Sequence, residues 1–177
     1  STAKSRRKTL MELVHYPDPI LDKQLQTFDI ENPPMDPKQL KKDMTDVMLK
    51  SNGIGLSACQ VGLDFTVFVM GDSEENSTIC INPVILQHTE ETVTEVEGCL
   101  SFPNVYVKVK RPKEILAEWY NENLEKQTVK IEGYSARVFL HEWDHLQGIT
   151  FKDRVSKLKW DMAQKKAKKI GKLTKIA

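Results

Sequence analysis

Two histidines enclose a glutamate in the segment His141-Glu142-Trp143-Asp144-His145. On a helix, residues four apart lie one above the other on the same face, so both imidazoles could bind one metal ion. Glu142 would project beside them, where its carboxylate could take a proton from a metal-bound water. The spacing predicts a metal-dependent hydrolase, and the alternative is a chance helix with two ordinary histidines.

A catalytic tetrahedral site needs a third protein ligand and keeps one position open for water. No histidine or glutamate follows His145, and Phe151 stands where the extended metzincin pattern has a third histidine. Asp153 is the only carboxylate shortly after the motif, and helix capping or a surface ion pair explains it better. The third ligand is therefore expected upstream.

The upstream candidates are His15, His88, Cys59, Cys80 and Cys99. Cys80 lies in an alternating, strand-like segment that fits a buried structural thiol, and His88 lies in a polar, exposed-looking stretch. Cys99 follows a glycine that allows close backbone approach, and the Ser-Phe-Pro after it interrupts regular structure. A thiolate near a dication would be deprotonated. Cys99 is the expected third ligand.

A glycine loop, GIGLSACQ at residues 53–60, offers a backbone that comes close to another group. A phosphate-binding loop is excluded, because no Gly-Lys-Ser/Thr, no third glycine at dinucleotide spacing and no preceding parallel strand is found. A tight turn is the alternative. The amide of Gln60 could donate a hydrogen bond to a developing oxyanion.

The elements that must position these residues follow from local patterns. Asp36-Pro37 reads as an N-cap with proline at the first helical position, and the helix it begins ends near Asn52-Gly53. A second helix, from about Ser135 to Gln147, carries the histidine pair. Strands rich in β-branched and aromatic residues are expected at Thr66–Met70, Ile79–Ile85, Val105–Val109, Ile115–Tyr120 and Thr128–Ile131. The fold class is α+β, with antiparallel sheets packed around the HExxH helix.

The whole chain has 177 residues, 40% of them hydrophobic, and a net charge of +1, which fits one domain spanning 1–177 and favours neither DNA nor a membrane as partner. An odd number of cysteines, three, indicates a reducing compartment. Ser1–Lys8 is basic and acid-free, and we expect it to be disordered. The expected location is the cytoplasm, or a mitochondrion or plastid if Ser1–Lys8 is the remnant of a transit peptide.

A last helix is expected from about Ser156 to Lys172. From residue 156 to 177 the chain has eight lysines and a single acidic residue, Asp161. Trp160, Ala163, Ala167 and Ile170 form an apolar stripe along this helix. An amphipathic helix docked on the domain with a solvated lysine face is one interpretation. The other is an electrostatic contact with ribosomal RNA near the nascent-chain exit.

Three motifs together resemble the peptide deformylase family: GIGLSACQ (53–60), EGCLS (97–101) and HEWDH (141–145). They occur in the family's order and at similar intervals, and the resemblance covers nearly the whole chain. Three residues depart from the pattern. Ser57 replaces an alanine, a small-for-small change expected to matter little. Leu140 stands where glutamine is usual, and Trp143 is bulkier than usual.

The resemblance implies a role for each matching residue. Cys99, His141 and His145 would bind the metal, with Glu142 as general acid and base. Gln60 and the backbone N–H of Leu100 would stabilise the oxyanion. Glu97 would pair with Arg111 and hold the strand of Cys99. Substrate contacts would come from the Gly55 backbone and from a methionine pocket lined by Ile54, Tyr134, the Arg137 stem, Val138 and the His141 ring.

The implied reaction removes the formyl group from the initiator methionine of nascent N-formylmethionyl peptides and releases formate. The implied cofactor is one divalent metal, Fe²⁺ in the cell, with Zn²⁺, Ni²⁺ or Co²⁺ as substitutes. A general HExxH peptidase is the rival enzyme, disfavoured because no downstream ligand exists. A ribosome-associated module with a structural metal is the non-enzymatic rival, and Glu142 argues against it, because a closed structural site needs no general base.

Overall fold

The computed structural model describes residues 11–176, with side chains to residue 171, and has the expected α+β fold. The expected disorder of Ser1–Lys8 lies outside the described residues. The helices are α1 (Pro37–Lys50), α2 (Gly133–Leu146) and α3 (Lys157–Ile176), with short 3-10 helices η1 (Pro19–Asp22), η2 (Ala58–Val61) and η3 (Phe151–Arg154). The strands are β1 (Gly55–Ser57), β2 (Val67–Gly71), β3 (Ser77–His88), β4 (Thr92–Cys99), β5 (Phe102–Pro112), β6 (Glu114–Tyr120) and β7 (Lys126–Glu132).

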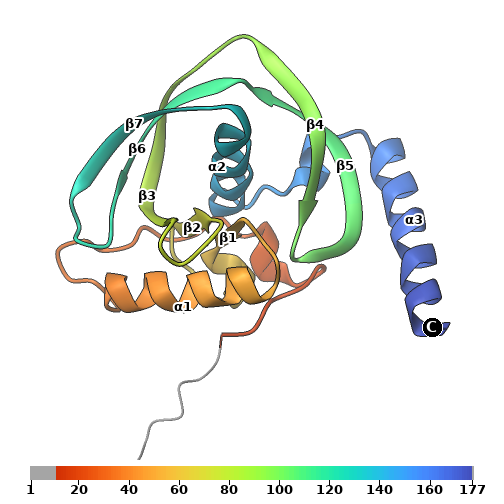
Figure 1. Ribbon diagram of the computed structural model, residues 1–177, viewed down its shortest axis with the longest axis horizontal. Coiled ribbons are helices and arrows are strands. Elements are labelled where there is room, and N and C mark those ends of the chain that lie inside the picture. Colours follow the sequence, from red (N-terminus) through yellow and green to blue (C-terminus); the bar gives the residue numbers. More distant parts are fainter. Residues whose placement is uncertain (1–10, 177) are drawn as a thin grey trace, which may run out of the picture.

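The strands form two antiparallel sheets, one with the order β1-β2-β3-β6-β7 and one formed by the β4-β5 hairpin. Helix α2 lies between the five-stranded sheet and the hairpin, and α1 runs beneath them (Figure 1). β1 is an edge strand, paired only with β2 through Gly55↔Met70 to Ser57↔Phe68. Both sheets therefore meet the helix that carries the histidines.

The local signals read from the sequence explain most elements. The Asp36 side chain accepts a hydrogen bond from Lys38 N at 3.0 Å and so caps α1, whose Leu40, Met44 and Met48 are buried. All five expected strands are present, each longer than or shifted by a residue or two from its prediction. Strands β1 and β4 had no prediction. Cys99 ends β4 and pairs with Phe102 at the start of β5, so the Ser-Phe-Pro segment continues a hairpin after a short turn instead of ending regular structure.

Aromatic packing fixes the two helices that follow the sheets. Phe139 of α2 meets Phe68 of β2 edge to face, with ring centroids 4.9 Å apart. On α3 the Trp160 ring packs edge to face against Phe102 at 5.5 Å and Phe151 at 5.3 Å. The predicted apolar stripe thus docks α3 beside β5, as Figure 1 also shows. No described helix has a stretch long and apolar enough to cross a membrane.

Candidate metal centre and its pocket

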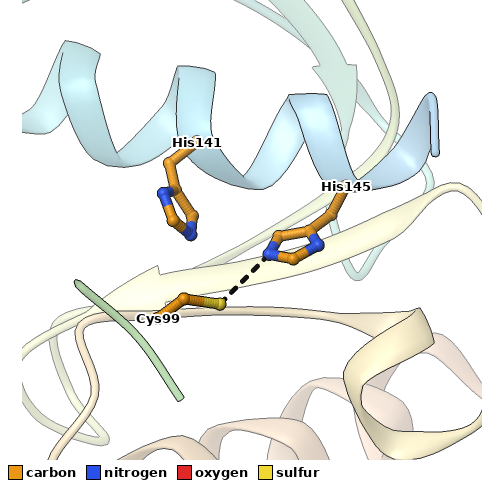
Figure 2. A group of neighbouring side chains, drawn as sticks. All are labelled: Cys99, His141 and His145. Carbon is orange, nitrogen blue, oxygen red and sulfur yellow. Dashed lines mark hydrogen bonds between the residues drawn. The ribbon is translucent and has the colours of Figure 1, made fainter. Parts of the chain in front are cut away.

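Helix α2 and the end of β4 bring one thiol and two imidazole side chains together. His141 and His145 project from one face of α2 toward Cys99 (Figure 2). Their candidate ligand atoms all lie within 4.8 Å of one another, and Cys99 Sγ is 3.4 Å from His145 Nε2. With metal–ligand distances of about 2.0–2.3 Å, tetrahedral ligands stand roughly 3.3–3.8 Å apart. The separations therefore suit one metal ion.

The other upstream candidates lie elsewhere. Cys59 and Cys80 are fully buried, and burial raises the pKa of both thiols, as expected of structural cysteines. His15 and His88 are exposed. Asp153 accepts a hydrogen bond from Thr150 N at 3.0 Å and so caps η3, the structural role expected of it.

Glu97 orients the first histidine from behind. Its Oε1 lies 2.8 Å from His141 Nδ1, which directs Nε2 toward the ligand cluster. Arg111 Nε and Nη2 donate to Glu97 at 2.6 and 2.9 Å, so the expected pair forms. Burial raises the pKa of Glu97, but the hydrogen bonds from His141 and Arg111 outweigh it and lower the pKa to about 2. Glu97 is therefore a fixed anion.

Arg137 does more than line the pocket with its stem. Its Nη1 donates to Glu97 at 2.6 Å and to the Val109 carbonyl at 2.8 Å, and its Nη2 donates to the Val93 carbonyl at 2.6 Å. One buried guanidinium thus ties α2 to both strands of the β4-β5 hairpin. No local pattern predicts these contacts, because the partners lie 28 to 44 residues away along the chain.

Asp144 is a further member that sequence reasoning left without a role. It is 2% exposed, and its Oδ2 accepts from Arg111 Nη1 at 2.9 Å. Arg154 of η3 adds two hydrogen bonds to the same carboxylate, at 3.0 and 2.7 Å. The position of Asp144 next to His145 in the motif was the only feature of the sequence that pointed to a role for it. The charges form a continuous chain from His141 to the surface.

The Glu142 carboxylate lies against β1. Ser57 Oγ lies 3.1 Å from its Oε1, and a Cβ at Gly55 would lie only 2.5 Å from its Oε2. The absence of a side chain at Gly55 therefore makes room for this carboxylate. Burial raises the pKa of Glu142, which suits a group that takes and returns a proton near neutral pH.

Gln60 is held in one orientation. Its Oε1 accepts from Ser57 N at 2.9 Å, and its Nε2 donates to Ser101 Oγ at 3.1 Å while lying 3.5 Å from Cys99 Sγ. Its amide N–H groups therefore face the cluster. The Leu100 N–H has no hydrogen-bond partner within residues 11–176.

A cavity of about 510 Å³ opens over the cluster. Its lining includes the residues expected at the substrate site: Ile54, Gly55, Gln60, Cys99, Leu100, Tyr134, Arg137, Val138, His141 and Glu142. Tyr106 was not expected there. Its ring covers Gly98, where a Cβ would lie 2.8 Å from Cε1, and 62% of Tyr106 is exposed at the rim.

The charges around the cluster fit a cation. Burial lowers the pKa of His141, but interactions with Cys99 and Glu97 outweigh burial and raise it well above its ordinary value. A positive charge is therefore favoured between these groups. Burial, then the His141 and Arg111 charges, hold the pKa of His145 well below normal, so that it stays neutral as a metal ligand requires. The donor set fits a divalent metal.

Fold and site together define an α+β protein with a Cys-His₂ metal-type centre and a buried glutamate beside it. Residues 10–161 match the family described as Polypeptide deformylase. The chain belongs to this family, which confirms the resemblance. Among curated relatives, "Peptide deformylase 1B, chloroplastic" of Oryza sativa is 42% identical over 82% of this chain, and "Peptide deformylase" of Rhizobium meliloti is 36% identical over 93% of this chain and 95% of the relative.

Solved structures agree. A plant peptide deformylase PDF1B is 34% identical, with a TM-score of 0.83 over 94% of this chain and 92% of that one. A peptide deformylase from Legionella pneumophila reaches a TM-score of 0.84 at 28% identity, covering 93% and 97% of the two chains. The chain spans 55% of the length of the Oryza sativa and Arabidopsis thaliana relatives.

Proposed function

We propose that this chain is a metal-dependent peptide deformylase, which hydrolyses the formyl group from N-formylmethionyl peptides and releases formate. One observation carries the proposal: Cys99, His141 and His145 converge at the base of the cavity, with the Glu142 carboxylate buried next to His141. Membership of the family supports the same activity.

Each residue has a defined task in this reaction. Cys99, His141 and His145 would hold the metal, which when bound supplies Lewis acidity and lowers the pKa of water. Glu142 takes a proton from the attacking water and delivers it to the leaving amine. The Gln60 amide and the Leu100 N–H donate to the oxygen that gains charge. Both donors are already in place, since Gln60 is held through Ser57 N and Ser101 Oγ and the Leu100 N–H has no hydrogen-bond partner within residues 11–176.

Substrate binding follows from the sheet edge and the cavity. β1 is an edge strand, so the backbone groups of Gly55 that face away from β2 can pair with the main chain of a peptide. The methionine side chain would enter between Ile54, Val138 and the Arg137 stem, with Tyr134 at the rim. A formyl carbon bears only hydrogen, so a closely fitting site excludes larger acyl groups.

Ferrous iron is the metal we propose for the cell, with zinc, nickel or cobalt as working substitutes. A thiolate with two imidazoles binds all four ions, and intrinsic affinity favours zinc over ferrous iron. Protein prepared without oxygen should contain iron and lose activity on exposure to air, whereas a nickel-loaded sample should not.

The direct test is formate release from formyl-Met-Ala-Ser, compared with acetyl-Met-Ala-Ser and with an internal peptide, and with metal content measured on the same sample. We expect turnover of the formyl peptide only. Cleavage of the internal peptide bond without formate release would identify the rival metallopeptidase instead.

The lysine face of α3 is the proposed contact with the ribosome. Lys165, Lys166, Lys168 and Lys169 are exposed on the docked helix, beside the exposed Leu158 and Met162. The backbone phosphates of ribosomal RNA would attract these lysines, and the attraction weakens as the salt concentration rises. If deletion from Lys165 onward leaves salt-dependent co-sedimentation with ribosomes unchanged, this contact is wrong. Cytoplasm remains the predicted location, with the organelles as the alternative.

A further inference from the structure

Ser57, one departure of the glycine loop from the family pattern, faces Glu142. Its Oγ lies 3.1 Å from Glu142 Oε1 and 3.0 Å from the Glu142 backbone oxygen. Ser57 is fully buried and Glu142 is 4% exposed, so both partners are largely shielded from bulk solvent. A buried hydroxyl at hydrogen-bond distance from a carboxylate is not equivalent to the methyl group of alanine.

One face of β1 forms a seat for the carboxylate. Gly55 and Ser57 are two residues apart in a strand, so their side-chain positions point to the same side. At Gly55 an added Cβ would lie 2.5 Å from Oε2, and at Ser57 the hydroxyl meets Oε1. In the part of the chain that the structure describes, Ser57 is the only side chain found to hydrogen-bond this carboxylate.

The same residue also fixes the amide of Gln60. Ser57 N donates to Gln60 Oε1 at 2.9 Å, which directs the amide N–H groups toward Ser101 and Cys99. The backbone of Ser57 thus orients the oxyanion donor, and its side chain reaches the general base. Alanine at this position would still supply the first contact through its backbone N–H, but its methyl group could not supply the second.

We propose that Ser57 is a positioning residue that donates a hydrogen bond to the Glu142 carboxylate and holds it in the orientation needed for proton transfer. This inference rests on the proposed deformylase activity, with Glu142 as general acid and base. The hydroxyl has a single proton, and the competing acceptor is the Glu142 carbonyl. Donation to that carbonyl would only join β1 to α2.

Ser57→Ala tests the positioning role in the metal-loaded protein. We expect kcat for formyl-Met-Ala-Ser to fall about tenfold, the equivalent of about 1.4 kcal/mol, with KM within about twofold and bound metal unchanged. Thr45→Val is the matched control, because Thr45 is a buried hydroxyl on α1 that bonds Ser77 instead of the site. It should keep the wild-type kcat. An unchanged kcat in Ser57→Ala overturns the proposal.

Combining Ser57→Ala with Glu142→Ala separates the two acceptors, since the second change removes the carboxylate and keeps the carbonyl. If Ser57 acts through the carboxylate, Ser57→Ala should not lower the residual rate of Glu142→Ala further. A tenfold fall in both backgrounds would mean that Ser57 acts by another route, and the proposal would be wrong.

Thermal unfolding provides a test that does not depend on turnover. It compares the wild type, Ser57→Ala, Glu142→Ala and the double variant. Ser57→Ala should lower Tm by at least about 2 °C more in the wild type than in Glu142→Ala. Equal decreases would show that the hydroxyl serves the carbonyl alone and would overturn the inference. Absence of formate release from the wild type would instead refute the deformylase activity, and the unfolding cycle would still test the Ser57–Glu142 contact.

Discussion

Two buried carboxylates flank the histidine pair, and the protein holds them in opposite ways. Glu97 receives hydrogen bonds from His141, Arg111 and Arg137. Glu142, beside His141 on α2, receives one from Ser57. The pKa of Glu97 is lowered to about 2, because the interactions with His141 and Arg111 outweigh burial, whereas burial raises the pKa of Glu142.

The two carboxylates therefore suit different tasks, one structural and one in proton transfer. A carboxylate surrounded by buried cations stays ionised and cannot exchange protons, so Glu97 serves as an anchor for His141. Among the described residues the Glu142 carboxylate has a hydroxyl partner and no cation bonded to it, and burial raises its pKa, so it is better suited to take up and release a proton. Pairs of acids whose surroundings push their pKa values apart are assigned to separate roles in this way.

Glu142→Gln removes the acid/base group directly and should have the largest effect on activity. The amide keeps the shape but cannot carry the proton, so kcat/KM for formyl-Met-Ala-Ser should fall about 10²–10⁴-fold. Metal content and Tm should stay near wild type, because no buried cation loses its partner. Formate release, metal analysis and thermal unfolding of the same sample measure activity, metal content and Tm. Retained activity would contradict the general-base role.

Glu97→Gln should instead lower stability and metal affinity, the two properties that Glu142→Gln leaves near wild type. Arg111 and Arg137 would then be buried without their shared anion, and we expect a loss of about 3–5 kcal/mol in the free energy of unfolding. Metal affinity should weaken roughly 10–100-fold, because the neutral amide oxygen of glutamine is a weaker acceptor than the carboxylate and orients the His141 ring less firmly. Glu95→Gln, an exposed change two residues earlier on β4, is the control. Urea unfolding and metal competition with a chelator measure the two effects.

The sequence predicted the anchor less well than the centre. The helix of His141 and His145 and the capped α1 follow from local spacing. The choice of Cys99 follows from the lack of a downstream ligand and from the residues on either side of this cysteine. Strand β4 was missed, since its sequence TVTEVEGC is polar and exposed along most of its length.

The partners of Arg137 and Asp144 could not be read from spacing either. Arg137 reaches Glu97 across 40 residues of chain, and Asp144 reaches Arg111 across 33. Only the docking of the β4-β5 hairpin against α2 brings these charges together. The contact of Ser57 with Glu142 spans 85 residues, which is why alanine and serine looked interchangeable there.

Gly55→Ala should displace the Glu142 carboxylate and have an intermediate effect on activity. A Cβ at this position would lie 2.5 Å from Oε2 and 2.9 Å from Cδ, so the carboxylate must move. A misplacement of this size should lower kcat by about 10–100-fold. Gly171→Ala is the control, because a Cβ there meets nothing within 4 Å. Equal kcat values for Gly55→Ala and the wild type would show that the position of Glu142 is not critical.

Arg154→Met probes the outer end of the anchor and should have the smallest effect. Its side chain is 41% exposed, and Asp144 keeps the buried Arg111 when Arg154 is lost. We expect a decrease of about 1 kcal/mol in the free energy of unfolding, since partly exposed ion pairs contribute little. Metal affinity should change by less than about threefold, because Glu97 and its two arginines remain intact. Arg154→Lys keeps the charge but not the paired hydrogen bonds. Its free energy of unfolding should lie between those of the wild type and Arg154→Met. A loss of metal affinity as large as that of Glu97→Gln would mean that the anchor depends on the whole chain of charges, out to the surface.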